Sequence, residues 1–194
     1  MLLRDPISLQ NEWVRLEPLA PDHAADLAVA ADGLEHAWYT LVPAPDAIGS
    51  EIRDRLALRE DGSSNPWAVR RLDTGRAVGM TSYLNIDQPN RRVEIGSTWL
   101  AVSAQRTAVN TAAKRLLLGH AFEECDAIAV EFRTHWHNRQ SREAIARLGA
   151  KQDGVLRNHR IGAEGTLRDT VVFSILPAEW PAVRLGLDAR LARD

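Results

Sequence analysis

The chain has 194 residues, of which 45% are apolar and 26% are charged, and these proportions are ordinary for one globular domain with a sizeable core. The formal net charge of −2 argues against a strongly basic surface for nucleic acid or for an anionic membrane. The single cysteine, Cys125, cannot form an internal disulfide, which fits a reducing cytosol. No apolar run has the length of a membrane span, and the N-terminus lacks a basic segment followed by an apolar signal core. We therefore expect a single cytoplasmic domain over residues 1–194.

Strands and helices are mixed in the first half of the chain. Alternating apolar and polar residues predict strands, and capped periodic segments predict helices. In chain order the predicted elements are a strand at 14–19, helices at 23–31 and 47–60, and strands at 67–72, 77–85 and 92–102. The last three strands are joined by short turns, which predicts an antiparallel meander.

The second half begins with a helix that packs by one face, since small and apolar residues recur every three or four positions from Val109 to Ala121. The predicted elements are a helix to about 124, a strand at 128–134, a helix from 138 that stops at Gly149, a hairpin of strands at 155–161 and 167–175, and a helix at 178–191. We therefore predict an α+β fold with a mixed, mostly antiparallel central sheet flanked by helices.

A candidate anion site lies at Gln105–Thr111, between the predicted strand at 92–102 and the helix that follows. The first turn of a helix leaves backbone N–H groups unpaired, and its dipole favours negative charge. Small side chains in this turn would let those amides reach a phosphate. The alternative is an ordinary amphipathic helix start.

Three motifs in the same order resemble the GCN5-related N-acetyltransferases (GNATs), in the branch that includes ribosomal-protein N-terminal acetyltransferases. The segment from Arg92 to Leu100 resembles the family's central strand. Gln105–Asn110 stands where the family has Q/R-x-x-G-x-G/A, and Asn138–Ser141 followed by Leu148-Gly149-Ala150 resembles its N-x-x-S helix. The resemblance covers roughly residues 14–175 and implies a GNAT-like fold.

The resemblance implies acetyl-CoA as co-substrate. Its pyrophosphate would meet the start of the helix, its pantetheine arm would pair with the strand edge at Leu100–Val102, and Asn138 would contact that arm. Two positions depart from the family pattern, because Ala108 replaces a glycine and Asn110 replaces a glycine or alanine. The implied cofactor-binding residues are Leu100, Val102, Gln105, Arg106, Thr107, Ala108, Val109, Asn110, Thr111 and Asn138.

Glu94 and Ser141 are the candidate catalytic residues. Glu94 stands on the predicted central strand, on one face with Gly96, Thr98 and Leu100, where a carboxylate is costly unless it is paired or faces a wet cleft. It could accept the proton of the attacking amine, or form an ion pair with Arg92 or Arg133. The resemblance places the Ser141 hydroxyl near the thioester sulfur, where it could protonate the departing thiolate. The alternative is that Ser141 and Asn138 only begin a helix.

Other side chains fit structural roles at least as well. His135 and His137 form an H-x-H pair, but no third ligand stands at a diagnostic spacing, so we expect no metal. Trp38, Trp67 and Trp136 are candidate pocket walls, with core packing as the alternative. Arg157, His159 and Arg160 form a basic cluster that could receive an acidic acceptor or the CoA 3′-phosphate, or be a solvated face.

The leading functional hypothesis is an acyl-CoA-dependent N-acetyltransferase that moves an acetyl group to a primary amine of a protein N-terminus or a small molecule. The alternatives are a CoA-binding or ligand-binding module without catalysis, and a structural interaction protein. The segments around 34–45 and 88–91 would line the acceptor site. Apolar residues near the C-terminus favour a homodimer, with domain core as the alternative; they are Val171, Val172, Phe173, Trp180, Val183, Leu185 and Leu187.

Overall fold

One eight-stranded sheet runs through the computed structural model, which describes residues 1–34, 39–40, 42–162 and 165–193. The strand order is β1-β2-β3-β4-β5-β6-β8-β7, and the pairing is antiparallel except between β5 and β6. The strands are β1 (Leu9–Gln10), β2 (Val14–Pro18), β3 (Ser64–Arg71), β4 (Ala77–Asp87), β5 (Arg92–Leu100), β6 (Ala129–His135), β7 (Lys151–Ile161) and β8 (Leu167–Ile175). The predicted α+β class with a mixed, mostly antiparallel sheet is confirmed.

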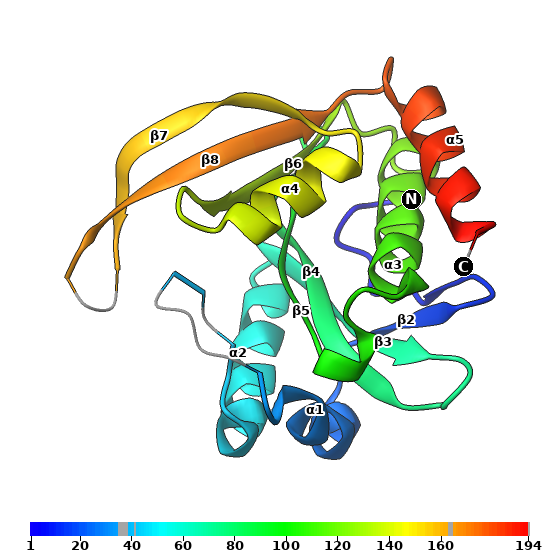
Figure 1. Cartoon of the computed structure of the whole chain (residues 1–194), viewed down its shortest axis with the longest axis vertical. Helices are drawn as coiled ribbons and strands as arrows, with labels where there is room; N and C mark the ends of the chain where they lie inside the picture. The colour runs from blue at the N-terminus through cyan, green and yellow to red at the C-terminus, as the bar shows by residue number, and fades with distance from the viewer. Residues whose placement is uncertain (35–38, 41, 163–164, 194) are drawn as a thin grey trace.

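Helices cover the sheet on both faces (Figure 1). They are α1 (Ala24–Ala31), α2 (Ile48–Glu60), α3 (Ala108–Gly119), α4 (Arg139–Arg147) and α5 (Trp180–Leu191). Arg55 of α2 donates to Ser82 of β4 at 3.1 Å, whereas Lys114 of α3 donates to the adjacent Thr81 at 3.2 Å. Because neighbouring strand residues point to opposite faces, α2 and α3 lie on opposite sides of the sheet.

Several predicted boundaries differ from the structure, including that of β7, which begins at Lys151 and not at 155. Strand β3 begins at Ser64 and includes Pro66, which has no N–H to donate but whose carbonyl accepts a hydrogen bond from Leu19 at 3.0 Å. Strand β5 ends at Leu100, and Val102 opens a 3₁₀ turn, Val102–Ala104. The helix predicted to continue to about 124 changes to a single π-helical turn over His120–Glu124.

The hydrophobic core lies between the sheet and its helices. Trp67, Tyr83 and Met80 from β3 and β4 are completely buried, as are Leu117 and Leu118 from α3. The Trp67 indole N–H donates to the carbonyl of Ile7 at 2.7 Å, so this ring is part of the core and not a pocket wall. Trp38 lies outside the described residues.

Candidate active site

The two central strands diverge after a short parallel contact. Arg92, Val93 and Glu94 of β5 pair with residues 129–131 of β6, and no further pairing follows. From Ile95 to Leu100, β5 is paired only with β4 on its other side. A free strand edge of this kind offers backbone N–H and C=O groups to an extended, amide-containing ligand. The pantetheine arm of CoA has such amides, so the wedge fits it.

A β-bulge interrupts β5 within this wedge. Ser97 has a φ of +47°, and the register with β4 shifts between the pairs Met80–Trp99 and Ser82–Gly96. A bulge changes the alternation of side chains along the strand. As a result Thr98 faces α3, where its hydroxyl accepts a 2.7 Å hydrogen bond from Lys114. The prediction that Glu94 and Thr98 share one face is therefore wrong.

Helix α3 begins where the free edge of β5 ends. The Thr107 hydroxyl caps the helix by accepting from the Val109 N–H at 3.3 Å, and Ala108 is the first helical residue. The positive φ of this turn, +58°, falls on Arg106. A glycine at position 108 is therefore not required by the backbone, and the departure from the family pattern there does not distort the turn.

The predicted anion-site residues divide between surface and core at the start of α3. Gln105, Arg106 and Thr107 are exposed, Asn110 and Thr111 are half-buried, and Ala108 and Val109 are buried. The exposed turn and the amides of the first helical turn form a positive dipole end at the mouth of the wedge. This arrangement fits a pyrophosphate group.

Glu94 lies in β5 at the narrow end of the wedge and is only 7% exposed. Its Oε2 accepts a 2.7 Å hydrogen bond from the Asn85 side-chain amide, and the Nε of Arg133 is 3.6 Å away. Burial raises the pKa of Glu94 above its ordinary value, and the contacts with Asn85 and Arg133 only partly oppose this effect. A buried carboxyl with a raised pKa is suited to general base catalysis.

Glu131 provides the contrast, because it is the register partner of Glu94 on β6. It forms ion pairs with Arg92 and with Arg133, the latter at 2.8 Å. Burial alone would raise the pKa of Glu131, but its hydrogen bonds with Arg133 and Arg92 hold that pKa below the ordinary value. Arg92 and Arg133 were the two candidate ion-pair partners of Glu94. Arg133 contacts Glu94, whereas Arg92 pairs with Glu131.

Helix α4 starts on the other side of the wedge, after β6. The Asn138 side-chain oxygen accepts from the Ser141 backbone N–H at 3.0 Å, so the predicted N-cap is confirmed. The cap uses the Ser141 backbone, which leaves its half-buried hydroxyl available for other chemistry. Capping and a catalytic role for Ser141 are thus compatible.

Ser141→Ala is expected to lower the turnover number by about 10²-fold or less, the lower range for one proton-transfer group, since a thiolate also leaves unaided. The Asn138 cap needs only the backbone N–H at position 141, so alanine should keep the helix and the CoA affinity. Steady-state kinetics across pH, together with calorimetric titration of CoA, would measure both. Full activity at every pH would show that Ser141 only begins the helix.

Lys114 is a buried amine that no sequence motif indicated. It is 5% exposed, and its Nζ donates to Thr81 at 3.2 Å and to Thr98 at 2.7 Å. The two hydroxyls are also 2.8 Å apart. Burial lowers the pKa of Lys114 to about 7. Lys114 therefore attaches the bulged segment of β5 to helix α3.

Lys114→Met is expected to stabilise the protein most at pH 7 and progressively less toward pH 10. Between the folded pKa of about 7 and the ordinary value of 10.5, the unfolded chain binds the lysine proton and the folded chain does not. The free energy of unfolding of the wild type should therefore rise with pH across this interval, and that of the methionine variant should lack this rise. Denaturant titrations of both proteins at pH 7 and 9.5 would measure the difference. The prediction would be contradicted if the free energies of unfolding of the two proteins changed with pH in parallel.

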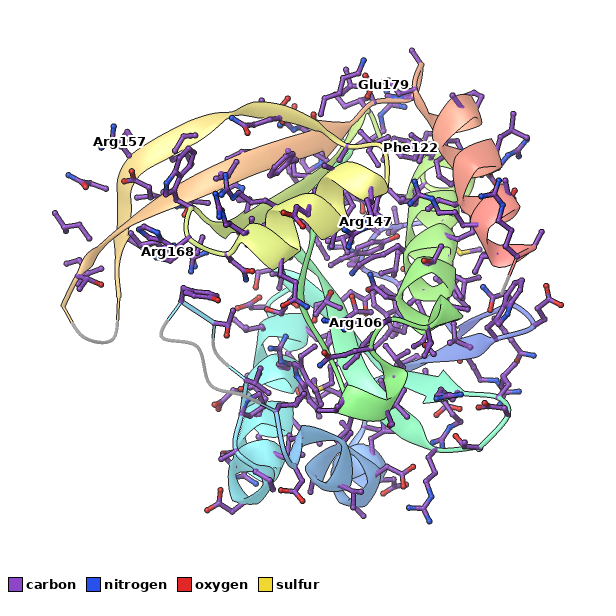
Figure 2. All side chains as sticks on the ribbon, in the orientation of Figure 1. Arg106, Phe122, Arg147, Arg157, Arg168 and Glu179 are labelled. Carbon is purple, nitrogen blue, oxygen red and sulfur yellow. The ribbon has the colours of Figure 1, made fainter. Side chains whose placement is uncertain are left out.

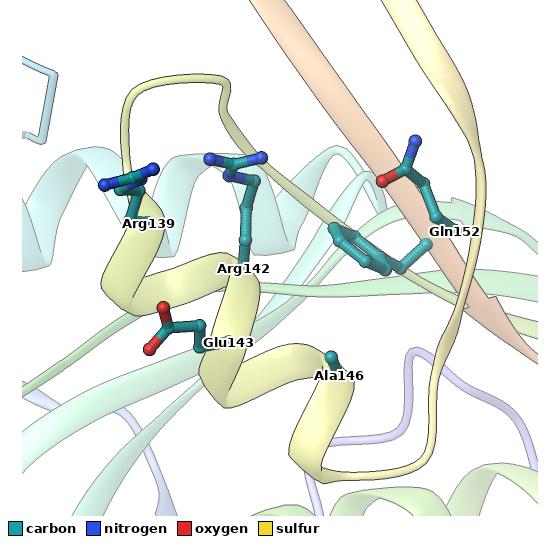
Figure 3. Close-up of a pocket in the computed structure, with 6 residues that line it drawn as sticks. Arg139, Arg142, Glu143, Ala146 and Gln152 are labelled. Atoms are coloured by element: carbon teal, nitrogen blue, oxygen red, sulfur yellow. The ribbon is translucent and has the colours of Figure 1, made fainter.

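The cavity in Figure 3 is separate from this wedge. It measures about 280 Å³ and lies between α4 and the β7–β8 hairpin, lined by Arg139, Arg142, Glu143, Ala146, Gln152 and Phe173. Neither Glu94 nor the start of α3 contributes to it. Within the described ranges, no group of three or more His, Cys, Asp or Glu side chains is placed to hold a metal ion. No helix of the described segments is long and apolar enough to cross a bilayer.

Comparison with known proteins decides the family. The family description "Acetyltransferase (GNAT) domain" matches residues 14–151, which is most of the chain. The chain belongs to the GNAT acetyltransferases. The Bacillus subtilis protein YdaF, which has the provisional name of ribosomal N-acetyltransferase, is 36% identical over 168 residues that cover 85% of this chain and 90% of YdaF. The resemblance to the branch with ribosomal-protein acetyltransferases is thereby confirmed.

Solved GNAT structures share the whole fold. A GCN5-related N-acetyltransferase from Brucella melitensis superimposes with a TM-score of 0.86 at 29% identity, covering 96% of this chain and 86% of that one. RimJ from Mycobacterium smegmatis, solved with CoA-disulfide, has a TM-score of 0.81 at 22% identity and covers 98% of this chain and 97% of its own. At 22% identity, the similarity to RimJ concerns the fold alone.

Proposed function

We propose that this GNAT protein transfers an acetyl group from acetyl-CoA to a primary amine, by direct attack in a ternary complex in the cytoplasm. The observation that carries the proposal is the wedge. It joins a free strand edge, a helix N-terminus and a buried carboxyl with a raised pKa within β5 and α3, which a short 3₁₀ turn connects. Acetyl-CoA would supply the thioester.

Each predicted residue has a distinct role in this proposal. The first turn of α3, with Gln105–Thr111, holds the pyrophosphate, and Leu100, Val102 and Asn138 contact the pantetheine arm. Glu94 accepts the amine proton directly or through a water molecule. A backbone N–H on the free edge of β5 stabilises the developing oxyanion, and Ser141 donates a proton to the leaving sulfur.

The alternative of a CoA-binding module without turnover rested on Ala108. Because Ala108 is the first residue of α3 and the left-handed position is Arg106, alanine fits this turn. The raised pKa of Glu94 favours catalysis over binding alone.

Calorimetric titration with acetyl-CoA, followed by a thiol-release assay against a panel of amines, tests the proposal. We expect saturable binding of acetyl-CoA and release of free CoA that depends on the amine. Binding without release for any amine would favour the module without catalysis. Absence of binding would contradict the proposal as a whole.

A homodimer stays a prediction, but on a different surface from the one the sequence indicated. Five of the seven apolar residues near the C-terminus are buried within the chain: Val171, Phe173, Trp180, Val183 and Leu187. Of the predicted seven, Leu185 on α5 is 66% exposed, and further exposed apolar side chains lie on the β7–β8 hairpin, where Ile161 is 75% exposed and Leu167 is 61% exposed. Light scattering at high micromolar concentration would detect a dimer, and a monomer there would contradict one.

A further inference from the structure

Arginine side chains gather on the sheet face that carries Glu94. The strand registers pair Glu94 with Glu131, His135 with Thr170, and Arg160 with Arg168. Since every second residue of a strand shares a face, Arg133 and Arg168 lie on this face with Glu94. The Tyr39 ring, from the segment between α1 and α2, approaches the His135 ring at 6.0 Å between centroids. In the proposed function, where Glu94 accepts the amine proton, this face receives the acceptor.

The charges on this face do not balance. Arg92 and Arg133 are paired with Glu131 and Glu94. Arg160 and Arg168 form no ion pair with any residue in the part of the chain that the structure describes. They stand directly opposite each other in the β7–β8 pair, and like charges in that position repel.

Arg168 is also incompletely satisfied. Its Nε is buried and has no hydrogen-bond partner within the described residues. Burial and the neighbouring Arg160 lower the pKa of Arg168, while Glu94 opposes them, so the three groups lie within electrostatic reach of one another. A buried guanidinium nitrogen without a partner is costly, so the Arg168 side chain is held in an unfavourable environment.

The orientation of the hairpin supports an inward-facing site. Figure 2 shows Arg168 on the inner side of the β7–β8 hairpin, toward the segment between α1 and α2, whereas Arg157 lies on its outer side. Arg157 is 78% exposed and already paired with Asp169 at 2.5 Å. Of the basic residues on this hairpin, Arg160 and Arg168 are thus the ones available to a molecule that approaches Glu94.

We infer that the acceptor is an amine that carries an anionic group, a carboxylate or a phosphate, which Arg160 and Arg168 bind while the amine meets Glu94. Planar guanidinium groups bind either anion through two parallel hydrogen bonds. A bound anion would pair with the terminal guanidinium nitrogens of the two arginines and remove the repulsion between them. This inference rests on the proposed function and excludes polycationic amines such as polyamines as preferred acceptors.

The test compares amines that differ only in charge. Acetyl-CoA-dependent thiol release is measured with the dipeptide amides Ala-Asp and Ala-Asn, and with Ala-phosphoserine and Ala-Ser. We expect the wild type to favour the acidic member of at least one pair by about 10- to 100-fold in kcat/KM, as for a hydrogen bond to a charged group. Preference within the first pair identifies a carboxylate, and preference within the second identifies a phosphate.

Variants of Arg160 and Arg168 test whether these two side chains cause the preference for the acidic amine. Arg168→Gln and Arg160→Gln should remove most of the preference, mainly by raising KM for the acidic member, and should leave the affinity for CoA unchanged. Arg168→Lys should restore part of it. Arg157→Gln, on the same hairpin but already paired, is the matched control and should behave as the wild type.

Four outcomes would overturn the inference. Equal kcat/KM within both pairs, or a preference that survives Arg168→Gln, would exclude recognition of an anion by these arginines. A loss of CoA affinity in Arg168→Gln would show that they serve the CoA phosphates. If no dipeptide turns over, calorimetric titration of each into the CoA-bound protein decides, and failure of both acidic members to bind contradicts the inference. The proposed function fails separately, if no amine at all releases thiol.

Discussion

Glu94→Gln is expected to lower kcat/KM for amine acetylation by about 10²- to 10⁴-fold near neutral pH, the range for loss of one general base. Glutamine keeps the size of the side chain and can still accept the hydrogen bond from Asn85. It cannot accept a proton. Because burial raises the pKa of Glu94, the wild-type rate should increase with pH over an interval that lies above the ordinary carboxyl range. The rate of the variant should not show this increase.

The same substitution should raise stability. The folded pKa of Glu94 exceeds its ordinary value of 4.5, so ionisation of the buried carboxyl costs folding free energy as the pH rises through that interval. Glutamine does not ionise, and the variant should therefore melt at a higher temperature than the wild type at neutral pH and at a similar temperature near pH 4. A gain in stability together with a loss of rate is typical of an active-site group held in an unfavourable environment.

Glu131→Gln is the matched control, because this neighbouring carboxyl lies opposite Glu94 but has a lowered pKa. It should retain acetylation. Removal of the Glu131 carboxylate would free Arg133 to pair with Glu94 and lower the pKa of Glu94. The rise of the pH–rate profile on its acidic side should therefore move to lower pH. Wild-type rates in Glu94→Gln, or an equal loss in both variants, would refute a specific base role for Glu94.

Thr107→Asp is expected to weaken CoA binding by about 10- to 100-fold, from Coulomb repulsion at partly solvated distances. Thr107 is exposed and caps α3, whereas Ala108 next to it is buried and a charge there would damage the helix itself. Aspartate is as good an N-cap as threonine, so the fold should be kept. Its negative charge would stand where the helix end should meet the pyrophosphate.

Thr107→Asn separates charge from capping. Asparagine also caps helices well and is neutral, so this variant should bind CoA nearly as the wild type does. Calorimetric titration of CoA at two salt concentrations measures both variants, and the aspartate penalty should shrink at the higher concentration. Equal affinities for the folded aspartate and asparagine variants would show that the pyrophosphate binds elsewhere.

The sequence was sufficient to predict most of the fold, because local patterns determine most of it. The alternating segments and short turns predicted the antiparallel run of β3, β4 and β5, and Asn138 predicted the start of α4. The order of three motifs predicted the family. Each of these signals depends on residues that are close together in the chain.

Features that depend on distant pairing were not predictable. The bulge at Ser97 depends on how β5 meets β4, and it reversed the face assigned to Thr98. The burial of Lys114 depends on how α3 packs over Thr81 of β4. The partners that give Glu94 and Glu131 opposite pKa shifts come from different strands. A local pattern carries no information on such contacts.

The short seam between β5 and β6 has a thermodynamic consequence. Only three residue pairs, Arg92–Glu94 with Ala129–Glu131, join these two strands. A ligand in the wedge would contact strands on both sides and act as a further cross-link that exists only in the folded state. By mass action, a ligand at 100 times its dissociation constant adds about 2.7 kcal/mol to the free energy of unfolding. The fraction of this protein that is folded would then depend on the concentration of its proposed co-substrate.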